Sequence, residues 1–110
     1  NIESLIAKVS YELVSEKILD KKEINKLLGV LASNGVYAMW VYAKSKKEID
    51  EDKFFEKLKP VLNKVQPFNS MDSESFFRSI SNDLHKVLFL KQLLEKTLIY
   101  ARYHAQALGD

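Results

Sequence analysis

The residues best placed for chemistry in this chain are cations. Lys44, Lys46 and Lys47 cluster directly after an apolar segment. Lys91 and Arg102 fall on one polar stripe of a long C-terminal helix, because residues 11 apart differ by only about 20° at 100° per residue. Cationic groups in such clusters suit the phosphate backbone of a nucleic acid. The sequence therefore predicts these five residues as nucleic-acid contacts, with a solvated face or a subunit contact as the alternatives.

Several common kinds of catalytic and metal site are missing from the sequence. His85 and His104 are the only histidines, and about 28 Å of helix separates them, so they cannot share a metal. The acidic segment 48–52 lacks the ligand spacing of a calcium-binding loop. The chain has no cysteine, and it contains neither a phosphate-binding loop nor a nucleophile motif. We expect no catalytic residue, no metal and no cofactor. An enzyme that uses His104 with a nearby carboxylate is the remaining catalytic alternative.

The composition predicts one helical domain over residues 1–110. The chain is 46% hydrophobic and 29% charged, with three glycines and two prolines, too few for the many turns of a sheet protein. Its formal net charge of +2 is mild, so we expect nucleic-acid binding to be weak and salt-dependent. Since the sequence has neither a membrane-length apolar run nor a signal-peptide pattern, a cytoplasmic protein without membrane contact is expected.

Apolar residues at steps of three and four predict the helices that hold these cations. Helices are expected over residues 2–18, 21–32, 36–43, 50–65, around 76–80 and over 83–108. Pro60 should kink the fourth helix or start a new first turn, and Ser81-Asn82 should cap the last helix. The expected fold is all-α, a compact bundle of five to six helices around the long C-terminal one.

Two segments carry a resemblance to a known family. Tyr100-Ala-Arg-Tyr-His-Ala-Gln-Ala-Leu108 closes a long apolar helix, and Asn34-Gly35-Val36 leads into an apolar helix that ends Tyr42-Ala-Lys-Ser-Lys46. Together these segments resemble the small subunits of CRISPR effector complexes. The type III-B form is the most similar, and the type III-A and type I-A small subunits are alternatives. The acidic residues 48–52 depart from the family pattern.

The resemblance implies a non-catalytic subunit in antiviral defence. It would stack in copies within a ribonucleoprotein complex, contact the other effector subunits, and help to hold guide RNA or target nucleic acid. Lys44, Lys46, Lys47 and Arg102 match the family's basic positions. A helical protein–protein adaptor or oligomerisation module that binds no nucleic acid is the alternative from another class.

Overall fold

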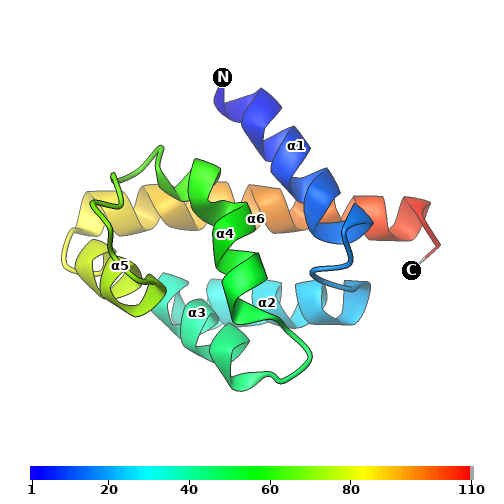
Figure 1. Cartoon of the computed structure of the whole chain (residues 1–110), viewed down its shortest axis with the longest axis horizontal. Coiled ribbons are helices and arrows are strands. Elements are labelled where there is room, and N and C mark those ends of the chain that lie inside the picture. Colours follow the sequence, from blue (N-terminus) through cyan, green and yellow to red (C-terminus); the bar gives the residue numbers. More distant parts are fainter. Residues whose placement is uncertain (110) are drawn as a thin grey trace.

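Six helices follow one another in the computed structural model, which describes residues 1–109 (Figure 1). They are α1 (Ile2–Ser15), α2 (Lys21–Asn34), α3 (Val36–Ser45), α4 (Glu51–Leu62), α5 (Ser73–Ile80) and α6 (Leu84–Ala107). No strand occurs within these described residues. The all-α prediction with a long C-terminal helix is confirmed.

Aspartates begin four of the helices, because a carboxylate at the N-cap accepts a bond from an otherwise unpaired backbone N–H. The Asp20 carboxylate accepts from the Glu23 N–H while the Glu23 carboxylate accepts from the Asp20 N–H, the reciprocal pair of a capping box. Asp50, Asp72 and Asp83 cap α4, α5 and α6 in the same way. The prediction that Ser81-Asn82 caps α6 is wrong, since Asp83 lies nearer the helix and carries the better acceptor.

Left-handed residues end two of the helices. Lys17 has φ 59°, and the N–H groups of Lys17 and Ile18 donate to the carbonyls of Val14 and Leu13. This closure ends α1 at Ser15, three residues short of the predicted end at residue 18. At the next junction Gly35, with φ 95°, separates α2 from α3, as the Asn-Gly pair predicted.

Pro60 does not restart α4. The helix runs through Pro60 and ends two residues later at Leu62. The ring removes the N–H that would donate to the Glu56 carbonyl, so one helical hydrogen bond is lost, but only two residues of the helix follow Pro60. The predicted fresh first turn is therefore wrong.

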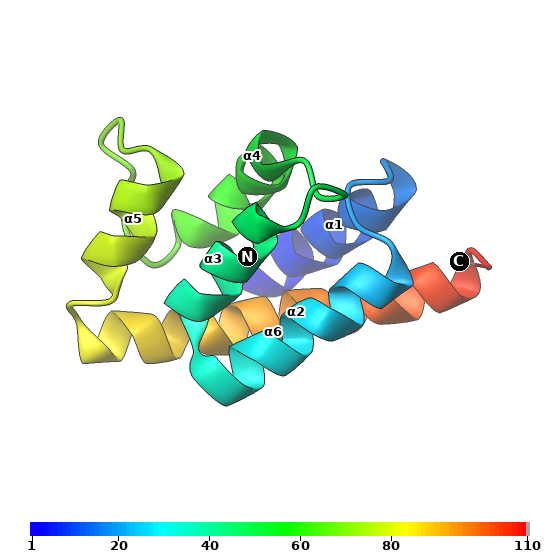
Figure 2. The same cartoon turned by 90° about the horizontal axis from the view of Figure 1, so that it is seen from below.

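The helices form two layers. α6 packs against α1, α2 and α3, and α4 packs on α1 (Figures 1 and 2). Figure 2 shows α2 and α6 along one edge of the molecule, with α4 and α5 toward the opposite edge. Within residues 1–109, no helix has the length and apolar character needed to cross a bilayer.

Aromatic side chains of α3, α4 and α5 pack against one another within the hydrophobic core. The Trp40 ring lies 4.7 Å from Phe77 and 5.6 Å from Phe54, in stacked arrangements. Phe55, Phe68 and Phe76 extend the cluster outward. Trp40 is fully buried, yet its Nε1–H has no hydrogen-bond partner among the described residues. Packing against the neighbouring aromatic rings, rather than a hydrogen bond, therefore holds the Trp40 ring in place.

Candidate nucleic-acid interface

The five predicted cations do not form one surface. Lys44 lies in the last turn of α3, and Lys46 and Lys47 begin the loop that leads to α4. This loop lies well away from α6 in both views (Figures 1 and 2). Lys91 and Arg102 on α6 are therefore separated from the lysines at the end of α3, and each group has to be judged by its own surroundings.

Lys44 is held by an internal ion pair. Its Nζ lies 2.8 Å from Glu74 Oε1 at the start of α5. The same carboxylate accepts bonds from the Tyr37 hydroxyl at 2.6 Å and from Arg78 at 2.6 Å. The bond from Lys44, followed by those from Tyr37 and Arg78, lowers the pKa of Glu74 from 4.5 to about 2. Lys44 thus ties α3 to α5, and a phosphate would have to compete with Glu74 for it.

Lys46 belongs to a larger basic group that the sequence pattern did not reveal. Its Nζ lies 5.0 Å from the centre of the Tyr42 ring. Lys22 and Lys26 of α2 line the same pocket, of about 270 Å³, as Tyr42 and Lys46. We name these four residues the basic corner. Lys22 and Lys26 are four residues apart on one side of α2, a spacing visible in the sequence, but only the contact between α2 and α3 brings them to Lys46.

The basic corner has the parts of a backbone contact site. Three ammonium groups and one phenol surround a shallow recess, and none of the three lysines forms an ion pair within residues 1–109. Lysine is a flexible point charge that suits phosphate oxygens, and a tyrosine ring can stack on a base. Asp20, Glu23 and Glu48 also line the recess, and Glu23 is engaged in the capping box. These three carboxylates equal the three lysines in formal charge, so the lining as a whole is neutral and any phosphate binding will be of modest strength.

Lys91 and Arg102 lie on one flank of α6, between its buried side and its outer face. Both are half-buried, and neither forms an ion pair within the described part of the chain. The Arg102 guanidinium lies 5.9 Å from the centre of the exposed Tyr103 ring. About 16 Å of helix separates Lys91 from Arg102, and Glu95 lies between them. These two cations are isolated charges on a partly apolar face rather than a continuous basic track.

The histidines do not form a site with each other. His85 is exposed near the start of α6, whereas His104 near its end makes an edge-to-face contact with Tyr11 of α1 at 5.4 Å. Among residues 1–109, no group of three metal-ligating side chains is close enough to hold an ion. His104 therefore contributes to the α1–α6 contact in this structure.

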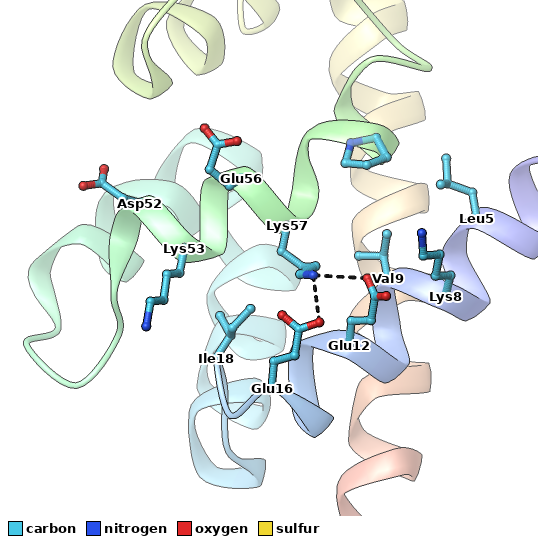
Figure 3. A pocket seen from close by; sticks show the side chains of 11 residues that line it. Leu5, Lys8, Val9, Glu12, Glu16, Ile18, Asp52, Lys53, Glu56 and Lys57 are labelled. Atoms are coloured by element: carbon cyan, nitrogen blue, oxygen red, sulfur yellow. Dashed lines mark hydrogen bonds and ion pairs between the residues drawn. The ribbon is translucent and has the colours of Figure 1, made fainter.

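An open groove lies between α1 and α4 (Figure 3). Leu5, Val9 and Pro60 form its apolar floor, and its volume is about 610 Å³. Lys57 reaches across it, with Nζ 3.0 Å from Glu16 and 3.2 Å from Glu12. The hydrogen bond that Lys57 donates to Glu16, followed by the one it donates to Glu12, raises the pKa of Lys57. These charges satisfy one another and join the two helices.

Comparisons with protein-family models, with curated proteins and with solved structures gave no match for this chain. Its function is therefore inferred from the residues and their geometry.

Proposed function

We propose that this chain is a non-catalytic helical subunit that contacts the nucleic-acid backbone through the basic corner. Lys22, Lys26 and Lys46 converge on one recess beside Tyr42 while remaining free of ion pairs within residues 1–109, and this observation carries the proposal. Exposed Lys47 follows directly and extends the positive charge along the loop. In its specific form, which the family resemblance supplies, the protein is the small subunit of a CRISPR effector complex that assists in holding guide RNA or target nucleic acid.

The test is binding of fluorescently labelled single-stranded RNA, measured by anisotropy at several salt concentrations. Replacing Lys22, Lys26 and Lys46 together with alanine removes three positive charges. For a single strand, removing one phosphate–cation interaction reduces the slope of log affinity against log salt by about 0.7, so the slope should fall by about 2. Binding itself should become barely detectable at physiological salt.

A matched control separates the basic corner from net charge. Lys8, Lys53 and Lys64 are also exposed and free of ion pairs within the described residues, and their triple alanine variant has the same net charge as the corner variant. The control should retain most of the affinity. Equal losses in the two variants, or no RNA binding by the parent chain at low salt, would contradict the proposal.

One observation favours a second candidate, a helical protein-binding module. Four large apolar side chains of α6 are exposed, which is typical of a surface that another protein covers. These side chains are Leu84, Leu88, Phe89 and Tyr103. This candidate predicts association that is insensitive to salt and independent of RNA.

A further inference from the structure

The outer face of α6 carries exposed apolar side chains among its polar ones. The inner face packs against α1, α2 and α3, as an amphipathic helix requires. The outer face nevertheless exposes Leu84 by 67%, Leu88 by 50%, Phe89 by 40% and Tyr103 by 60%. Several large apolar side chains exposed on one helix are typical of a surface that another protein covers. The outer face of α6 therefore has the character of a contact surface.

The side chains of this face follow the spacing of a helix–helix seam. Leu88, Gln92, Glu95 and Ile99 lie four, three and four residues apart, the alternation with which one helix packs on another. Apolar residues occupy the two ends of this row and polar residues its middle. Lys91 lies beside the middle, and within residues 1–109 neither Lys91 nor Glu95 forms an ion pair. The row is therefore nearly the same when read in either direction.

We propose that a second copy of this chain covers the outer face of α6, with the two α6 helices antiparallel in a closed two-fold dimer. In this orientation Leu88 packs against Ile99 of the second copy, and Gln92 lies opposite its Glu95. Glu95 then also comes beside Lys91 of the second copy, and symmetry repeats this pair. A parallel, in-register arrangement would instead place Glu95 opposite Glu95 of the second copy, which is unfavourable.

Charge and polarity favour a second copy over other occupants. A membrane surface would bury the polar middle of the row, where Lys91, Gln92 and Glu95 lie. A nucleic acid would meet Glu95 between the two cations of this face. A copy of the same chain alone supplies both the apolar ends and the opposite charges in matching order. This inference is independent of the basic corner, which lies on α2 and α3.

The first experiment measures molar mass by sedimentation across a range of concentrations up to about 100 µM, because dimer formation depends on protomer concentration. The parent chain should approach twice its monomer mass. Leu88→Glu should remain monomeric, whereas the control Val41→Glu, at a position 41% exposed on α3, should dimerise as the parent does. A parent chain that stays monomeric throughout would overturn the proposal, whichever other protein it binds.

A charge exchange tests the pair of Lys91 and Glu95 across the dimer. Lys91→Glu alone and Glu95→Lys alone should each weaken dimerisation severalfold, since each variant places like charges together twice. The double variant should recover most of the loss. Additive weakening in the double variant would contradict the antiparallel arrangement.

Cross-linking fixes the direction of the helices, because the natural chain has no cysteine. A mixture of Leu88→Cys and Ile99→Cys chains should form the mixed disulfide under mild oxidation. In the antiparallel dimer two copies of residue 88 lie about 16 Å apart along the helices, beyond the reach of a disulfide. A dominant cross-link between two Leu88→Cys chains would show a parallel dimer and overturn the proposal.

Discussion

Glu74 shows how one side chain can fix the position of a short helix. It accepts bonds from Tyr37, Lys44 and Arg78, so three donors from α3 and α5 meet on one carboxylate. α5 has only eight residues and would not be stable alone. Because the ion pairs are near the surface, they contribute more to the orientation of α5 than to the free energy of unfolding.

The depressed pKa of Glu74 makes its contribution dependent on pH. Because the folded-state pKa is about 2 and the ordinary value is 4.5, the stabilisation is complete above pH 4.5 and is lost as the pH falls toward 2. In Glu74→Gln, the free energy of unfolding should change less over this interval than in the parent. Urea denaturation followed by circular dichroism at a series of pH values measures the difference. Identical pH slopes would show that Glu74 is not ion-paired in solution.

Trp40 presents the opposite case, a buried donor without an acceptor in the described chain. An unpaired buried N–H costs about 1–3 kcal/mol, while the ring stabilises the fold through stacking with Phe54 and Phe77. Trp40→Phe removes the unpaired donor along with part of the ring, so we expect a net loss of only about 1 kcal/mol. Trp40→Ala should cost about 3–5 kcal/mol. Equal losses in denaturant titrations of the two variants would indicate that Nε1 has a partner such as buried water.

At the scale of elements, replacing two glycines by alanine should have opposite effects on stability. Gly29 lies exposed within α2, and a β-carbon added there would meet nothing within 4 Å. Gly35 has equal space, but its φ of 95° is unfavourable for any side chain. Gly29→Ala should therefore raise stability by about 0.5–1 kcal/mol, and Gly35→Ala should lower it by about 1–2 kcal/mol. Thermal unfolding of the two variants, which add the same atoms, measures both. A stabilising Gly35→Ala would mean that this junction is not left-handed.

The sequence predicted the helices well because their signals are local. Asp20 with Glu23, Asp50, and the Asn34-Gly35 pair act through neighbours within four residues, so their structural effect can be read without knowing the fold. The errors fell where two local signals competed. Ser81, Asn82 and Asp83 can all cap a helix, and Asp83 is the residue whose carboxylate accepts from the Lys86 N–H.

At the scale of the whole molecule, the candidate site was less predictable because it depends on contacts between distant residues. Lys44 and Lys46 are close in sequence, yet one pairs with Glu74, 30 residues away, while the other joins Lys22 and Lys26 across the α2–α3 contact. Periodicity places a cation on a face but does not identify the element opposite. The basic corner therefore required the three-dimensional structure.

The arrangement of layers also predicts an order of local unfolding. α1 and α2 both pack extensively on α6, whereas α5 packs chiefly on α3 and is reached through the irregular residues 63–72. Segments with few neighbours open at lower free energy than the rest of a protein. In hydrogen exchange followed by mass spectrometry, amides of α5 should exchange well before those of α1, α2 and α6.

The substitution Glu74→Gln tests whether the contacts of this one side chain control how readily α5 opens. The substitution removes the negative charge that holds Lys44 and Arg78, so exchange in α5 should become several-fold faster. Exchange in α1 should not change, because no bond of Glu74 reaches that helix. Ser79→Ala is a useful comparison, because it removes the bond from Gln66 to α5 while leaving the Glu74 cluster intact, and it should have a smaller effect. Uniform acceleration across all six helices would instead mean that α5 opens only with the whole bundle, and that the two layers unfold as one cooperative unit.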